Sequence, residues 1–167
     1  MTVYNSVGYD ANSNPMYRTG KVLRTVHAEL SVDISEATDG DVYVLAGGLT
    51  TNSRIHRIMA PEGIVKFAAA DDNDLGFYYY KAGVLTAIDA DVLVDGLDIA
   101  TAATACVDLL GTNTALDRTK TIGELVSLSP DNTYAGGIYL CMTINTKETT
   151  ADKIIDLDVV IEDPVSN

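Results

Sequence analysis

Tryptophan is missing from this sequence, and histidine, cysteine and phenylalanine occur only twice each among 167 residues. Cys106 and Cys141 have no Cys-x-x-Cys spacing, so we expect two small buried thiols and neither a zinc site nor a redox pair. His27 and His56 lie on different predicted strands, in outward or irregular positions. No catalytic histidine is predicted from them.

Basic residues are also few. The chain has 11 Lys and Arg against 24 Asp and Glu, which gives a formal charge of −13. Binding to nucleic acid depends on Lys and Arg that neutralise phosphates, so this balance argues against nucleic acid as a direct partner. A strongly acidic exterior favours solubility and basic partner surfaces.

Long apolar runs do not occur, and the longest are only a few residues, far below the ~20 that a membrane-spanning helix needs. The first residues, MTVYNSVGYDANSN, lack the basic and apolar segments of a secretory signal. We therefore expect synthesis in the cytoplasm and no membrane partner. The 47% hydrophobic content and the length predict one folded domain.

Motifs for catalysis or cofactor binding are missing as well. No serine lies in a Gly-x-Ser-x-Gly elbow, and the glycine pairs at 47–48 and 136–137 lack a phosphate-binding context, so we interpret them as turns or bulges. The acidic run 71–74 (DDND) raises a calcium hypothesis, but Leu75 stands where an EF-hand needs an oxygen ligand. We expect a solvated turn there, no cofactor, no metal, no catalytic residue and no enzymatic activity.

What the sequence does contain is a series of short strands. Apolar and polar residues alternate over 21–32, 138–144 and 155–161, and shorter strands are predicted at 42–46, 53–59, 64–69 and 75–81. Arg24 interrupts the apolar face of the first strand, so we expect it near the strand's end or in an ion pair. Residues 88–98 are typical of a loop with a helical turn, and residues 100–105 could add an edge strand.

The order of these elements predicts the fold class. Residues 121–128 form the clearest short helix, with Thr121 as its cap. The last two strands are expected to pair antiparallel, each with one core face and one wet face. The whole indicates an all-β protein, an antiparallel β-sandwich of jelly-roll or Ig-like type. We expect this domain at 21–163, an extended N-terminal arm at 1–20 and a C-terminal tail at 164–167.

Tyrosine is the abundant aromatic residue, with nine copies, and it supplies the candidate contact residues. Four residues of the arm suit contact with its own domain or with a neighbouring subunit, although a frayed terminus is the alternative. They are Tyr4, Tyr9, Met16 and Tyr17. In the run 78–80, Tyr79 shares a face with Leu75 and Phe77, so Tyr78 and Tyr80 are expected to face solvent or a partner.

Several segments follow one another in a characteristic order. They are residues 39–45 (DGDVYVL), 53–58 (SRIHRI), 74–78 (DLGFY) and 90–98 (ADVLVDGLD), then the helix around 123–125 and two closing strands. In this order, over about residues 21–162, the chain resembles a family of small tailed-bacteriophage virion proteins, usually seen as capsid-associated or decoration proteins. It departs from that family at 46–51, where a Gly-Gly segment replaces a shorter Pro-containing turn.

The resemblance implies a subunit on or beside the major capsid shell, without enzymatic activity and present in many copies. Its partners would be the major capsid protein and other copies of itself, as dimers or trimers, on the capsid exterior of the virion. The expected function is capsid decoration and stabilisation, with the arm docking on a neighbour. The alternative is a carbohydrate- or receptor-binding β-sandwich of a head fibre or tail, which would use Tyr78, Tyr80 and nearby acids, with or without calcium.

Overall fold

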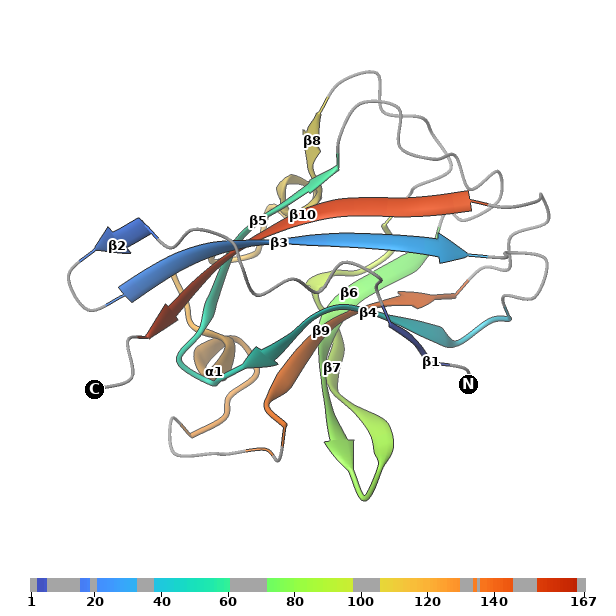
Figure 1. Cartoon of the computed structure of the whole chain (residues 1–167), viewed down its shortest axis with the longest axis horizontal. Coiled ribbons are helices and arrows are strands. Elements are labelled where there is room, and N and C mark those ends of the chain that lie inside the picture. Colours follow the sequence, from blue (N-terminus) through green and yellow to red (C-terminus); the bar gives the residue numbers. More distant parts are fainter. Residues whose placement is uncertain are drawn as a thin grey trace.

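The computed structural model describes residues 3–5, 16–18, 21–32, 38–60, 72–97, 106–129, 134, 136–145 and 153–164. In this part of the chain, ten strands form two five-stranded sheets packed face to face (Figure 1). The strand order is β1-β4-β9-β6-β7 in sheet A and β2-β3-β10-β5-β8 in sheet B. The predicted β-sandwich is confirmed. The strands predicted at 64–69 and 100–105 lie outside the described residues.

Each sheet combines strands that are far apart in the sequence. Sheet A consists of β1 (Val3–Asn5), β4 (Asp41–Leu49), β9 (Ile138–Ile144), β6 (Asn73–Lys81) and β7 (Val84–Val94). Sheet B consists of β2 (Met16–Arg18), β3 (Lys21–Val32), β10 (Lys153–Pro164), β5 (Arg54–Ala60) and β8 (Val107–Asp108). The 3₁₀ turn η1 (Leu109–Thr112) and the one-turn helix α1 (Ile122–Leu125) lie between β8 and β9.

Helix α1 begins where the sequence predicts. The Thr121 side chain accepts a hydrogen bond from the Glu124 amide, and the Glu124 carboxylate accepts one from the Thr121 amide, at 2.7 Å. This reciprocal capping box satisfies amide groups that a helix start leaves without partners inside the helix. The predicted helix is therefore present, but it is shorter than the range 121–128.

The pairing of the eight strands β3 to β10 is nested. β3 pairs with β10, β4 with β9, β5 with β8 and β6 with β7, all antiparallel. The pairs β10–β5 and β9–β6 complete the two sheets. A long hairpin wrapped on itself in this way has the topology of a jelly roll. Of the two sandwich types predicted, the structure therefore has the jelly roll.

The two closing strands correct one prediction. They do not pair with each other, because β9 lies between β4 and β6 in sheet A and β10 lies between β3 and β5 in sheet B. Alternation identifies the buried face of a strand and carries no information about its partner. The prediction of one buried face and one solvent-facing face holds for β10. It is wrong for β9, where Cys141 and Thr143 are buried on the face that points away from the main core.

Residues 88–94 also differ from the prediction, since they continue β7 and do not form a helical turn. The register between β6 and β7 shifts twice near residues 75–78, and the resulting bulge removes the period of two that marks a strand. The bulge passes over Gly76, where an added Cβ would lie 2.2 Å from the Asp89 oxygen and 2.3 Å from the Ala90 carbonyl carbon. Only glycine fits at this crossing.

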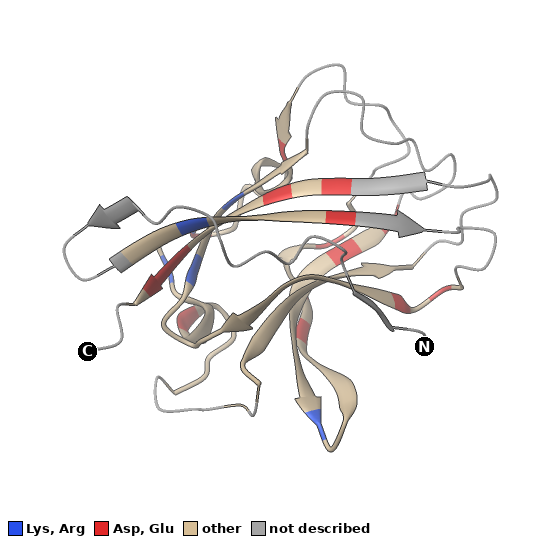
Figure 2. Cartoon of the chain, in the orientation of Figure 1, with Lys and Arg blue, Asp and Glu red and all other residues tan. Residues whose placement is uncertain are grey.

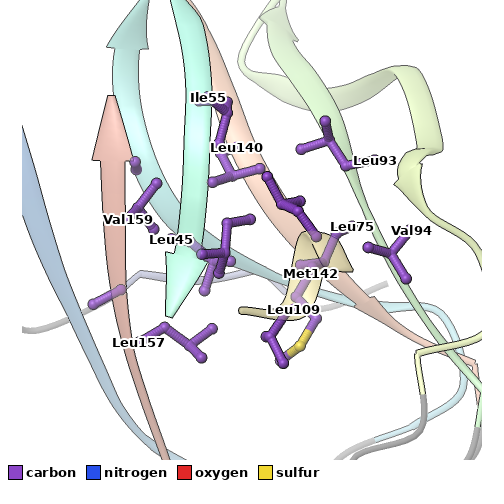
Figure 3. Close-up of a cluster of buried hydrophobic side chains, with 14 of the residues drawn as sticks. Leu45, Ile55, Leu75, Leu93, Val94, Leu109, Leu140, Met142, Leu157 and Val159 are labelled. Atoms are coloured by element: carbon purple, nitrogen blue, oxygen red, sulfur yellow. The ribbon is translucent and has the colours of Figure 1, made fainter. Parts of the chain in front are cut away.

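The inner faces of both sheets form one apolar core (Figure 3). Sheet A contributes residues such as Leu45, Leu75 and Leu140, and sheet B contributes residues such as Ile55 and Val159. Each fully buried side chain of this size contributes about 1.5–3 kcal/mol through the area removed from water. The core therefore depends on both sheets being complete.

Arg24 lies at the end of this core, paired as predicted. Its Nε donates to the Asp163 carboxylate at 2.5 Å, and the Ser53 hydroxyl donates to the other oxygen of Asp163 at 2.6 Å. The hydroxyl of Ser53 in turn accepts from the Thr50 amide at 3.0 Å. This network satisfies a charged group that would otherwise be costly at the edge of an apolar core.

The N-terminal arm contributes a strand to each sheet. β1 runs parallel to β4, with Tyr4 opposite Tyr43, and β2 runs antiparallel to β3, with Tyr17 opposite Val22. β1 and β2 are the edge strands of the two sheets, outside β4 and β3, which are consecutive in sequence. The β1–β4 pair is the one parallel pair among the described strands.

Replacing Val159 with alanine should lower the free energy of unfolding by roughly 2 kcal/mol, because two methyl groups are lost from a packed site. Val159 is 0% exposed and lies between Val26 and Ile58 in the centre of sheet B. The matched control is Val160→Ala on the outer face, which should cost less than about 1 kcal/mol. Urea unfolding of both variants measures the difference, and equal losses would contradict this assignment of faces.

Gly76→Ala should be among the most damaging single substitutions, with a loss of about 3 kcal/mol or no folding, because the new Cβ meets backbone atoms of the β7 bulge. Gly111→Ala is the control, since its added Cβ meets only the end of the Arg118 side chain at 3.7 Å. Thermal unfolding followed by circular dichroism compares the two. A tolerated Gly76→Ala would show that the bulge does not cross β6 there.

Candidate functional site

The outer face of sheet A carries a second apolar cluster. Its buried members are Val42, Val44, Tyr78, Leu85 and Cys141, and Tyr80, Ala90 and Tyr139 pack against them. Tyr78 is only 4% exposed, its hydroxyl lies 2.6 Å from the Thr143 hydroxyl, and burial raises its pKa. The expectation that Tyr78 faces solvent is therefore wrong, although it shares a face with Tyr80 as predicted. The reason is that this sheet is apolar on both faces.

Tyr80 lies further along the β6–β7 hairpin and is half-buried. Its ring meets Tyr139 edge-on, with centroids 5.1 Å apart, and on the opposite face Tyr79 packs on Tyr134 at 4.5 Å. The pairing of β6 with β9 ends at Tyr78, so residues 79–86 continue as a two-stranded ribbon beyond β9 (Figure 1). Aromatic contacts on both faces hold this ribbon at its base.

The ribbon ends in a tight, exposed turn. Ala82 and Gly83 have positive φ angles of 51° and 83°, between Lys81 and its partner Val84. Hairpin turns of this kind usually place Asn, Asp or Gly at the first position, so alanine there adopts a strained conformation. Val84 is 59% exposed. The tip thus presents small apolar groups next to one lysine (Figure 2).

A pocket of about 610 Å³ lies at the opposite end of β7, lined by residues 94–97 and 112–115. Among the described residues of this lining, Asp95 is the one that carries a charge. The Asn113 side chain fixes one wall, since its Nδ2 donates to the Leu93 oxygen at 2.9 Å and its Oδ1 accepts from the Ala115 amide at 3.1 Å. Sequence reasoning did not find this pocket, because its two walls are distant in the chain.

The outer face of sheet B carries a cross-strand charge cluster around His27. Its Nδ1 lies 3.0 Å from Asp158 and 3.5 Å from Asp156, and its Nε2 lies 3.8 Å from Glu29. The hydrogen bond to Asp158 and the charges of all three carboxylates raise the pKa of His27, against a smaller opposing effect of burial. This cluster connects β3 with β10 and is open to solvent, with His27 51% exposed.

Other basic side chains are also used in ion pairs within the fold. Arg54 and His56 share the Glu162 carboxylate, at 3.2 and 3.1 Å. Arg118 donates to one carboxylate oxygen of Asp108 at 2.5 Å. The other oxygen of Asp108 accepts from the Leu110 amide in η1, at 3.3 Å. These contacts connect neighbouring strands and turns, which is a structural role.

The acidic run that raised the calcium hypothesis serves to join loops. Asp71 lies outside the described residues. Asp74 accepts from the Gly96 amide at 3.2 Å and from the Asn145 side chain at 2.6 Å. Within the described ranges, no group of three or more His, Cys, Asp or Glu is arranged to hold a metal ion.

The glycine pairs form a bulge and a turn, as predicted: residues 47–48 lie in the bulged part of β4, and residues 136–137 form a turn in which the Gly137 amide donates to the Tyr134 oxygen at 2.8 Å. β4 changes register against β9 around residues 46–49, and an added Cβ at Gly47 would lie 2.8 Å from the Tyr139 ring. An added Cβ at Gly137 would lie 3.0 Å from the Gly48 Cα. The glycines therefore allow the chain to approach itself closely, because neither site has room for a side chain.

The two cysteines differ from each other. Cys141 is buried, as predicted, and burial raises the pKa of its thiol. Cys106 is exposed, which corrects the expectation that both are buried. It precedes the two-residue strand β8, which lies at the edge of sheet B.

The predicted contact residues of the arm are only partly placed. Tyr4 belongs to β1, and Met16 and Tyr17 belong to β2, so their backbones extend the two sheets of the same chain. Tyr9 lies outside the described residues. The arm and the hairpin ribbon contact different parts of sheet A, β4 and β9 respectively.

A scan against protein-family models and searches among curated proteins and solved structures found no match. Among the described residues, no helix has the length and apolar character needed to cross a membrane.

His27 should make stability dependent on pH. Because its pKa is raised on folding, its contribution is complete below the ordinary value of about 6.5 and is lost as the pH rises through the folded value. At pH 5.5 the free energy of unfolding of the wild type should exceed that of His27→Gln by less than about 1 kcal/mol, because solvent screens the exposed His27 side chain. This difference should disappear by about pH 8.5. Thr25→Gln, on the same face of β3, should show no such change in urea unfolding. A gap independent of pH would contradict the ion cluster.

Proposed function

We propose that this chain is a virion structural protein that decorates and stabilises the capsid of a tailed bacteriophage through protein–protein contacts. The observation that carries this proposal is the way the N-terminal arm attaches. Two short strands of the arm extend the edges of both sheets through backbone pairing. Strand addition of this kind works equally between chains, since main-chain hydrogen bonds do not depend on which subunit supplies the strand.

The architecture agrees with this proposal. Jelly rolls occur in viral capsid proteins, and they also occur in lectins. A fold by itself does not decide between these uses, so the surfaces carry the argument. On sheet A, Tyr78 is buried, which removes one of the two exposed rings that the carbohydrate-binding alternative requires.

The charged groups also support a structural role. His27, Arg54, Arg118 and their carboxylate partners connect strands and turns within the domain. The chain's net charge of −13 leaves an acidic exterior, which suits contact with a shell surface that presents basic groups. In this proposal the jelly roll provides a rigid body, and the arm and the hairpin ribbon provide the contacts.

Co-sedimentation with purified capsid shells of the phage tests this function. The full chain should sediment with the shells at a fixed copy number, and removal of residues 1–20 should weaken binding by about tenfold or more, because the strand pairing is lost. Tyr4→Pro with Tyr17→Pro provides a second test, since proline disrupts strand pairing without shortening the chain. Tyr4→Phe with Tyr17→Phe is the matched control and should bind normally.

Three outcomes would overturn parts of this proposal. A full chain that does not sediment with shells would remove the decoration function. Unchanged capsid binding and oligomeric state after removal of the arm would remove the arm's role. Reproducible sugar binding on a glycan array, abolished by a chelator, would favour the carbohydrate-binding alternative.

A further inference from the structure

We propose that the hairpin tip of one copy, residues 81–84, inserts into the β7 pocket of a neighbouring copy, formed by residues 94–97 and 112–115. This inference rests on the proposed function in one respect, that the chain acts in several copies. It names the surface through which copies contact each other. This contact would be separate from those of the arm, because the tip and the pocket lie at the two ends of β7 and the arm pairs with β3 and β4.

The hairpin tip has the properties of a preformed contact element. Ring contacts on both faces fix the ribbon at its base, so little conformational freedom would be lost on binding. Val84 is exposed, and Ala82 has a positive φ that Asn, Asp or Gly would adopt at lower cost. A strained alanine at an exposed turn is explained if a partner requires a small apolar side chain there.

The β7 pocket has the complementary properties. Its volume of about 610 Å³ lies within the range of roughly 300–1,000 Å³ found for binding pockets. Gly96 and Ala115 give its described lining small exposed residues, next to the almost fully buried Val94 and Leu97. Asn113 fixes its other wall through hydrogen bonds. An apolar turn of the size of Ala82-Gly83-Val84 matches such a recess.

Charge favours a second copy as the occupant. Lys81 is the one basic residue among the described strands of sheet A, and it lies at the tip (Figure 2). Asp95 is the one charged residue in the described part of the pocket lining. Two copies with a net charge of −13 repel each other, so a contact between them requires a place where opposite charges meet. Lys81 and Asp95 provide this pair.

The geometry requires that tip and pocket belong to different copies. Residues 84 and 94 are the two ends of β7 and lie roughly 30 Å apart at about 3.3 Å per residue. Direct pairing of two β7 edges is less favourable, because the bulge interrupts this edge and places Asp89 and Asp91 on it. These two carboxyls already interact, since burial raises the pKa of Asp89 and so does a hydrogen bond in which the protonated Asp89 carboxyl donates to Asp91. The tip is therefore the available contact.

Disulfide trapping tests the contact directly. In a Cys106→Ser background, Ala82→Cys and Thr114→Cys are made as separate proteins and mixed under mild oxidation. The mixture should give a dimer on a non-reducing gel, and neither protein alone should do so. A mixture of Ala82→Cys with Thr25→Cys, on the outer face of sheet B, is the control and should stay monomeric. No trapped dimer in the first mixture, or equal trapping in the control, would overturn the proposal.

Charge reversal provides the second test, by sedimentation velocity over a range of concentrations. Lys81→Glu should weaken self-association by about tenfold, and Lys81→Glu with Asp95→Lys should restore it, because the pair is then reversed and not lost. Circular dichroism confirms that the variants fold. A wild-type chain that stays monomeric, or a double variant no better than the single one, would overturn the inference.

These assays use the purified protein without capsids, so they separate this inference from the proposed function. A chain that binds shells normally but shows no contact between tip and pocket overturns only the inference. A chain that is trapped as described but does not bind shells overturns only the capsid function.

Discussion

The pairing of β3 with β10 is the interaction on which the rest of the structure depends. Twelve residues of each strand pair in register, from Lys21 opposite Pro164 to Val32 opposite Lys153. This ladder joins the two ends of the domain and encloses the other nested pairs. Its closure brings together residues more than 130 positions apart in sequence, as in the contacts of His27 with Asp158 and of Arg24 with Asp163. Such a non-local contact is entropically costly, and the buried inner faces of both strands offset the cost.

The two sheets then differ in how they meet solvent. Sheet B has one apolar face, and its outer face holds ion pairs that cross from β3 to β10 and from β10 to β5. Sheet A is apolar on both faces of its central strands. Glycines allow close approach within it, at Gly76 beneath the β7 bulge and at Gly47 beneath the Tyr139 ring. Because its side chains are buried on both faces, sheet A exposes apolar contact groups mainly where the β6–β7 ribbon extends past β9.

Local pattern was sufficient for part of this structure. The alternation in β3 and β10 identified their buried faces, and the Thr121 cap located α1. The interruption at Arg24 indicated a position near the strand's end or an ion pair, and the ion pair is present. Which strands pair with each other was not predictable from the sequence. The alternation in β9 and β10 favoured pairing between them, but they lie in opposite sheets. The predictions that Tyr78 faces solvent and that residues 88–98 form a loop were wrong for a related reason. A second buried face and a bulge are produced by neighbouring strands, and they leave no periodic signal in the sequence. The β7 pocket depends in the same way on segments that only the fold brings together.

A strongly acidic subunit limits how copies can assemble. Repulsion between like charges extends over about 8–10 Å at physiological ionic strength, so attraction must come from contacts of shorter range. We propose two such contacts for this chain: backbone pairing by the arm, since main-chain hydrogen bonds need no charged group, and a projecting apolar tip with a single lysine. Both lie away from the acidic cluster formed by Glu29, Asp156 and Asp158 on sheet B. In the assembly that we propose, this separation leaves that face to solvent or a basic partner, while the hairpin tip and the arm make the contacts between copies.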